Sequence, residues 1–295
     1  MKISLHSVSY SGTWGAQCCL PLDKVITKAA EFGYDGIEIV AKRPHGSPLD
    51  LDVDSRKRLK DFIKSKGLKI ACLAAYNDFA DPNPYNREVN LLQVRETIHL
   101  AHDLGAKLVR VFASGMGDMH TGAGFDEQWA WVCENLIKAA KYAEDEGIVL
   151  GLQNHPPIVN SYKNVLQMIR EVRSDSLKAV IDAPLLHLAG ESVTEAVKEA
   201  GNLLVHSHIG PGDQRWQRGP LERTMGGFRR IYEIKQFPMG EGDTNYKTFI
   251  NSLKEIGYEG FLSYEICAPV PGGGEEKNLD KWVQNVLKYT RNLLR

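Results

Sequence analysis

The sequence predicts an α/β protein, a (β/α)8 barrel that forms one domain over residues 1–295. Short runs rich in β-branched residues alternate with helix-length amphipathic segments, eight of each, which is typical of parallel strands linked by helices. Six of the expected helices end in glycine just before the next strand, and glycine readily adopts the left-handed conformation that closes a helix. No GxGxxG fingerprint follows the first strand, whereas an open doubly wound sheet would normally carry one.

The expected strands cover residues 2–8, 36–40, 69–75, 108–113, 149–153, 179–182, 203–209 and 260–266. The expected helices cover residues 22–32, 54–66, 87–104, 126–146, 162–173, 192–200, 246–256 and 280–294. The long connections are expected to be loops at residues 41–53, 76–86, 114–125 and 211–240. Long loops on the active face of such a barrel usually form the pocket or a contact between subunits, and the second alternative would make the protein a homo-oligomer.

Composition excludes several classes of partner. The formal net charge of −1 over 295 residues provides none of the broad attraction that nucleic acid or an anionic membrane requires. No apolar run approaches the roughly 18 residues of a membrane helix, and the N-terminus is predicted to be a strand rather than a signal peptide. The five cysteines are odd in number and lack CxxC spacing, which argues against a disulfide framework. We therefore expect a cytoplasmic protein that binds small molecules.

Polar side chains at strand ends are the candidates for chemistry, because an inward charge in a barrel is costly unless it is paired or binds a metal. His206 and His208 are two residues apart in one strand, so their side chains point the same way. Oxygen donors with one imidazole suit a divalent ion, with Mn²⁺ or Mg²⁺ favoured and Zn²⁺ or Co²⁺ as alternatives. The remaining strand-end candidates are Glu38, Gln153, Asp182 and Glu265.

Four short motifs, at residues 32–39, 206–210, 239–243 and 257–265, resemble the sugar phosphate isomerase/epimerase superfamily of xylose isomerase-like TIM barrels. Their order and spacing extend the resemblance over essentially the whole chain. Ketose 3-epimerases of this type hold a metal with a glutamate, an aspartate, a histidine and a second glutamate. The resemblance implies that the corresponding positions here are Gln153, Asp182, His208 and Glu265.

Gln153 departs from this pattern, which has glutamate at the same place. An amide oxygen can coordinate a divalent ion, but it brings no charge and accepts no proton at neutral pH. The site therefore carries one negative charge fewer than with glutamate, and we expect it to bind the metal more weakly.

The resemblance implies a metal-dependent isomerase or epimerase that acts on a ketose or another small carbohydrate through an enediolate. The resembling epimerases use both ligand glutamates as bases, and here only Glu265 remains. Either His155 or His206 is then the acid or second base. Alternatively, His155 fixes the loop before Pro156, and His206 hydrogen-bonds Glu265 or a water. A lyase or dehydratase acting on a keto sugar or cyclitol is the second hypothesis, and a non-catalytic sugar-binding barrel is the third.

Four further residues are candidates for substrate binding. Glu38 either hydrogen-bonds sugar hydroxyls or forms a salt bridge at the rim with Lys42 or Arg43. Trp14 follows the first strand and can stack on a sugar ring. Glu241 lies between two glycines that would let the backbone approach the site, and the alternative is a solvent-exposed turn. Arg215 follows the His-x-His-Ile-Gly motif where the resemblance implies a substrate-contacting arginine.

Endonuclease IV relatives share this barrel but use three zinc ions. Their pattern has a histidine three positions after the sixth-strand aspartate, where this chain has Leu185. It also has an Asp-x-His after the seventh-strand histidine, and Arg215 stands where that final histidine belongs. The absent ligands argue against DNA repair.

Overall fold

The computed structural model describes residues 1–295 except 14–16, 116–118, 211–212 and 225–226; the side chains of 213–222, 224 and 228–235 are also outside the description. The strands of the main sheet are β1 Lys2–His6, β2 Gly36–Val40, β3 Lys69–Ala74, β4 Leu108–Val111, β5 Val149–Gln153, β6 Leu177–Asp182, β7 Leu204–His208 and β10 Phe261–Tyr264. The α-helices are α1 Leu22–Phe32, α2 Val53–Ser65, α3 Pro84–Leu104, α4 Phe125–Asp145, α5 Tyr162–Val172, α6 Ala183–Leu188, α7 Val193–Ala200, α8 Tyr246–Glu255 and α9 Glu276–Leu294.

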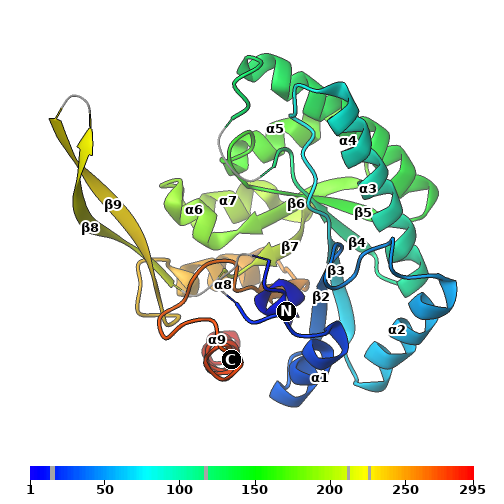
Figure 1. Cartoon of the computed structure of the whole chain (residues 1–295), viewed down its shortest axis with the longest axis horizontal. Coiled ribbons are helices and arrows are strands. Elements are labelled where there is room, and N and C mark those ends of the chain that lie inside the picture. The colour runs from blue at the N-terminus through cyan, green and yellow to red at the C-terminus, as the bar shows by residue number, and fades with distance from the viewer. Residues whose placement is uncertain (14–16, 116–118, 211–212, 225–226) are drawn as a thin grey trace.

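The main sheet closes into a barrel with the order β1-β10-β7-β6-β5-β4-β3-β2, and every pair is parallel. Helices surround the strands (Figure 1). The glycines expected to close helices have positive φ, for example 90° at Gly33 and 78° at Gly105. Helix α3 begins earlier than the apolar pattern predicts, because the Asn83 side chain caps it and Pro84 fits its first turn. The predicted barrel is confirmed.

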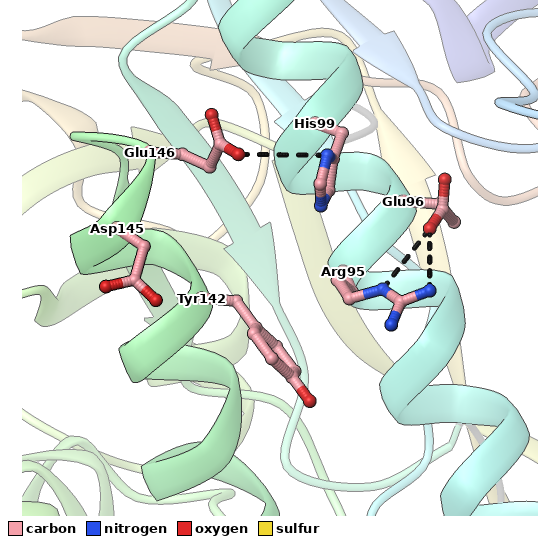
Figure 2. A pocket seen from close by; sticks show the side chains of 6 residues that line it. All are labelled: Arg95, Glu96, His99, Tyr142, Asp145 and Glu146. Atoms are coloured by element: carbon pink, nitrogen blue, oxygen red, sulfur yellow. Dashed lines mark hydrogen bonds and ion pairs between the residues drawn. The ribbon is translucent and has the colours of Figure 1, made fainter.

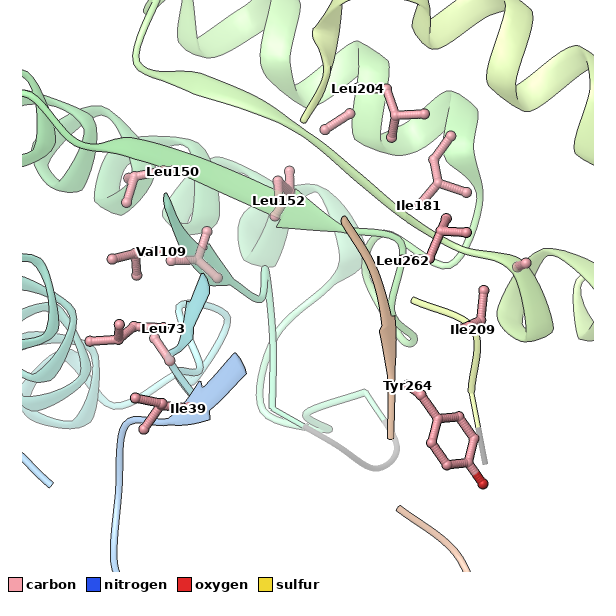
Figure 3. Packing of buried hydrophobic residues seen from close by; sticks show 14 of the residues in the cluster. Ile39, Leu73, Val109, Leu150, Leu152, Ile181, Leu204, Ile209, Leu262 and Tyr264 are labelled. Atoms are coloured by element: carbon pink, nitrogen blue, oxygen red, sulfur yellow. The ribbon is translucent and has the colours of Figure 1, made fainter. Parts of the chain in front are cut away.

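Side-chain alternation gives the barrel two different faces. Leu152 belongs to the apolar core, whereas its neighbour Gln153 contacts polar groups inside the barrel. In the same way, Ile37 and Ile39 belong to the core, and Glu38 between them contacts buried histidines. Figure 3 shows the apolar layer that the strands contribute. The apolar core therefore lies between strands and helices, and the interior of the barrel is left for polar groups.

Residues 211–240 were predicted to be a loop, and this prediction was wrong. The structure has two antiparallel strands there, β8 Asp213–Thr224 and β9 Gly227–Phe237, with Asp213 opposite Phe237. They form a two-stranded ribbon that extends away from the barrel (Figure 1). The ribbon adds no strand to the barrel, so the repeated strand and helix pattern in the sequence does not indicate it.

Helix α6 was also missed. It begins directly after β6, where the Asp182 carboxylate accepts from the backbone N–H of Leu185. Pro184 is an acceptable first-turn residue there, because the first backbone N–H groups of a helix need no intrahelical acceptor.

The cysteines and the apolar helices bear on two expectations from the sequence. All five cysteines are free thiols, as their number and spacing predicted. Within the described residues, no helix is both long enough and apolar enough to cross a membrane.

The first and last helices are joined by a half-buried ion pair. Lys28 Nζ of α1 lies 2.8 Å from Glu276 Oε1 and 2.7 Å from Asp280 Oδ2, both in α9. The Tyr10 hydroxyl donates to the other Asp280 oxygen at 2.7 Å. Because the Lys28 side chain is 11% exposed and that of Lys24 is 48% exposed, the two lysines should contribute differently to stability.

We expect Lys28→Met to lower the free energy of unfolding by about 1–3 kcal/mol, because it removes the cation that lies 2.7 Å from Asp280 and one of the lysines that contact Glu276. Lys24→Met is the matched control, since Lys24 contacts Glu276 from a solvated position; its cost should be at most about 1 kcal/mol. Urea unfolding at constant pH measures both. Equal losses in the two variants would contradict this account of how α9 is held.

Candidate functional site

The four predicted metal ligands converge at one end of the barrel. Gln153, Asp182 and His208 are the last residues of β5, β6 and β7, and Glu265 directly follows β10. These four strands are neighbours, and parallel strands open at the same end. All four residues are buried, and one ligand atom from each of Asp182, His208 and Glu265 lies within 4.8 Å of the other two.

His208 lies between the Glu38 carboxylate on one side and the carboxylates of Asp182 and Glu265 on the other. Its Nδ1 lies 3.2 Å from Glu265 Oε1 and 3.8 Å from Asp182 Oδ2. Its Nε2 lies 3.1 Å from Glu38 Oε2. An imidazole held through one nitrogen by a carboxylate presents the other nitrogen in a fixed direction, which is the usual arrangement of a metal-binding histidine.

Glu38 is fully buried inside the barrel and contacts three histidines. Its carboxylate lies 2.8 Å from His206 Nε2 and 3.5 Å from His6 Nε2, besides its contact with His208. The sequence allowed a salt bridge between Glu38 and Arg43 at the rim, and this alternative is wrong because Arg43 pairs with Asp50. Burial favours a neutral Glu38, but the three imidazoles outweigh it and hold the pKa of this carboxyl well below its usual range.

Sequence reasoning missed two residues of this interior. His6 contacts Glu38 and lies 3.8 Å from Glu265 Oε2. Arg110 is fully buried; its NH1 donates to the Ala75 carbonyl at 2.8 Å, and its guanidinium lies 4.0 Å from the centroid of the Phe112 ring. Both are polar residues inside apolar strand runs, the same signal that singled out Glu38.

The pKa values of the buried groups diverge. Burial opposes protonation of His208, but Glu38 and Glu265 outweigh it and raise its pKa to about 10. Burial raises the pKa of Asp182 and His208 lowers it. The effect of burial is larger, and the pKa rises to about 7. Burial opposes ionisation of Glu265 too, yet His208 lowers its pKa to about 2. Burial lowers the pKa of His6 to about 4. Without a metal, a protonated His208 lies between two ionised carboxylates, Glu38 and Glu265.

The amide of Gln153 completes the group of predicted ligands. Its Nε2 donates to Asp182 Oδ2 at 2.9 Å, and its Oε1 is buried with no hydrogen-bond partner in the described part of the chain. Two carboxylates, one imidazole and one unpaired amide oxygen are the donors that a divalent cation such as Mn²⁺ or Mg²⁺ accepts. The residues therefore fit the ion that the sequence predicted.

A second buried group, Glu38, Cys72 and His206, also brings three potential ligands close together. Burial raises the pKa of the Cys72 thiol well above its usual range, so the thiol keeps its proton, and it lies 3.3 Å from the Leu73 carbonyl as a donor. The Glu38 carboxylate already has three imidazole partners. This second group is better explained as packing around Glu38 than as a metal site.

The two candidate proton carriers have different surroundings. His206 is fully buried, and its Nε2 is bonded to Glu38 rather than to the Glu265 considered from the sequence. His155 is half-buried; its Nδ1 lies 2.7 Å from the Pro156 carbonyl, and its ring centroid is 4.4 Å from that of Phe112. His155 therefore contacts the loop after β5, which is one of the two roles that the sequence allowed for it.

Of the other predicted substrate residues, Glu241 is described by the structure and does not join the buried cluster. Trp14 lies outside the described residues, as does the side chain of Arg215, whose backbone is opposite Lys235 in the ribbon. Glu241 is exposed in the turn after β9. The close approach expected at its neighbouring glycines is made to α9: a Cβ at Gly240 would lie 2.5 Å from the Tyr289 ring.

A hollow on the outer surface lies between α3 and α4, and none of the predicted site residues lines it (Figure 2). Its polar contacts are surface ion pairs such as His99–Glu146 at 3.8 Å and Arg95–Glu96 at 3.1 Å. Such exposed pairs contribute little and assign no chemistry. The lining residues are Arg95, Glu96, His99, Tyr142, Asp145 and Glu146.

Comparisons with known proteins identify the family and the fold. A family model described as a xylose isomerase-like TIM barrel matches residues 26–293. Similar sequences include fructoselysine 3-epimerase from Shigella flexneri, 26% identical over 84% of this chain and 86% of that protein. L-ribulose 3-epimerase from Mesorhizobium japonicum is 24% identical over 90% and 80% of the two chains. A D-psicose 3-epimerase structure from Clostridium cellulolyticum H10, with D-tagatose, has the same fold, with a TM-score of 0.78 at 20% identity and complete coverage of both chains.

We expect Glu38→Gln to lower the pKa of His208 from about 10 toward the ordinary 6.5, because the change removes the carboxylate charge and keeps the size of the side chain. Protonated His208 stabilises the folded state through its carboxylate partners. This contribution is complete below pH 6.5, the ordinary histidine pKa, and is lost as the pH rises through about 10. The variant should therefore lose part of the stability that the unchanged protein shows at pH 7.

NMR titration of histidine-labelled, metal-free protein measures the pKa directly, and urea unfolding at pH 7 and pH 10 measures the stability. Glu171→Gln, which alters a surface carboxylate bonded to Trp129, is the control and should leave His208 unchanged. An unaltered His208 titration in Glu38→Gln would show that Glu38 does not hold this ring.

Proposed function

Because the chain belongs to the xylose isomerase-like TIM barrel family, we propose that it is a metal-dependent isomerase or epimerase that acts on a ketose or ketose derivative through an enediolate. The observation that carries the proposal is the buried convergence of Gln153, Asp182, His208 and Glu265 at the carboxyl ends of four adjacent strands. The names of the relatives make fructoselysine, L-ribulose and D-psicose the first substrates to test.

The proposed cation is held by those four residues, with Mn²⁺ or Mg²⁺ favoured because most of the donors are oxygen atoms. A divalent ion bound there would polarise the substrate carbonyl and lower the pKa of the adjacent C–H group. His208 contributes only after its Nδ1 loses its proton, because a metal requires the lone pair.

Glu265 is the proposed base that removes the proton from carbon. Its side chain is 10% exposed, compared with 5% for Asp182 and 0% for Glu38, so it is the cluster carboxylate most accessible from outside. Burial disfavours its ionised form, but the nearby His208 lowers its pKa to about 2 and keeps it ionised. An ionised carboxylate beside a polarised carbonyl is suited to this step.

His155 is the proposed second proton carrier, because Gln153 accepts no proton. The Pro156 carbonyl can only accept a hydrogen bond, so His155 Nδ1 carries the hydrogen and Nε2 is the basic nitrogen of the neutral ring. Burial lowers the pKa of His155 and so favours this neutral ring. His206 is less suitable, because the Glu38 carboxylate at 2.8 Å occupies its Nε2.

Incubation of candidate ketoses with the protein and Mn²⁺ in D₂O tests the proposed chemistry. We expect deuterium in the recovered ketose at the carbon next to the carbonyl, together with an epimeric or isomeric sugar. A dehydrated or cleaved product would instead support the lyase hypothesis. No exchange and no product with any of the ketoses would support the non-catalytic sugar-binding barrel.

We expect Glu265→Gln to lower kcat by at least about 100-fold, because the amide accepts no proton and weakens metal binding. Glu259→Gln is the matched control, since Glu259 is an exposed glutamate before β10 and its amide should leave kcat unchanged. Circular dichroism verifies that both variants fold. Similar kcat values for the Glu265 variant and the control would remove Glu265 from the chemistry.

A further inference from the structure

The amide of Gln153 is bonded through its nitrogen only. Its Nε2 donates to Asp182 Oδ2 at 2.9 Å and lies 3.3 Å from His208 Nδ1, so it contacts two of the side chains proposed to hold a cation. Its Oε1, the only amide atom that can coordinate a metal, is buried and has no hydrogen-bond partner among the described residues. The amide is therefore oriented as a donor to the site.

The surroundings of Asp182 favour this orientation. One carboxylate oxygen accepts from the backbone N–H of Leu185 at 3.0 Å, and the other accepts from Gln153. The Asn154 side chain accepts from the Asp182 backbone N–H at 2.7 Å and fixes the end of β6. The amide atom next to Asp182 Oδ2 is therefore the nitrogen, and the lone-pair atom Oε1 is on the other branch of the amide.

A cation requires the other amide atom. A metal ion needs a lone pair, which the amide offers at Oε1 and not at Nε2. In the orientation described, Nε2 rather than Oε1 is the amide atom next to Asp182 Oδ2 and His208 Nδ1, the atoms proposed to hold the ion. Glutamate, with two equivalent oxygens, has no such conflict at this position.

We propose that Gln153 stabilises the metal-free site as an internal donor to Asp182, and that this hydrogen bond breaks and the amide turns over when the ion binds. The inference rests on the proposed function, since it concerns the same metal site. It predicts that the ion is held weakly and exchanges readily.

Three variants test the inference on chelator-treated protein, with Mn²⁺ titration by calorimetry and thermal unfolding as readouts. Gln153→Glu should bind Mn²⁺ at least about tenfold more tightly than the unchanged protein, because it adds charge and needs no reorientation. Gln153→Met keeps the length of the side chain but donates no hydrogen bond, so the metal-free variant should unfold about 2–4 °C lower.

Gln128→Met is the matched control. Gln128 is also fully buried, donates to the His120 and Ala123 carbonyls at 2.9 Å, and has no hydrogen-bond partner for its Oε1 within the described part of the chain. It lies in α4, outside the metal site, so its loss should lower the unfolding temperature and leave the Mn²⁺ affinity unchanged.

Two results would overturn the inference while leaving the proposed function in place. One is a metal-free Gln153→Met that is as stable as the unchanged protein, and the other is a Gln153→Glu variant with unaltered Mn²⁺ affinity. If neither the unchanged protein nor Gln153→Glu binds Mn²⁺, the proposed metal site itself is wrong, and the inference is wrong with it.

Discussion

The buried carboxylate of Glu38 is the constraint on which the barrel interior depends. A carboxylate with no exposure is strongly unfavourable unless other groups compensate its charge, and here three imidazoles surround it. They come from β1 and β7, the strands that lie on either side of β10 in the barrel. Glu38 therefore joins strands that are far apart in the sequence, and it orients His208 before any ligand arrives.

His208 transmits this constraint to the strand ends. With one nitrogen directed at Glu38, its other nitrogen has to face Glu265 and Asp182. The interior is thus divided into a closed part around Glu38 and a part around Glu265 that is partly accessible. Chemistry belongs to the accessible part, and the closed part supplies its orientation. Gln153 adds an amide where a second carboxylate would give the accessible part another base.

The repeated strand and helix pattern predicted the barrel and the polar residues at its strand ends. The selection of Gln153, Asp182, His208 and Glu265 as proposed ligands came from the family resemblance. The interior contacts could not be predicted in this way. That Glu38 meets His6 and His206 depends on how the strands close around the axis, which leaves no signal in any one strand. Arg110 was overlooked although its position within an apolar strand gave the same signal as Glu38. The β8–β9 ribbon was mistaken for a loop because it lies outside the repeat on which the prediction relied.

Equilibrium dialysis against Mn²⁺, followed by metal analysis, tests the central claim most directly, because it asks whether these ligands bind an ion irrespective of the substrate. The account predicts about one equivalent of Mn²⁺ per chain at saturation, and loss of that ion in Asp182→Ala, which removes a ligand carboxylate. An Asp182→Ala variant that retains the ion, or an unchanged protein that binds none, would contradict it.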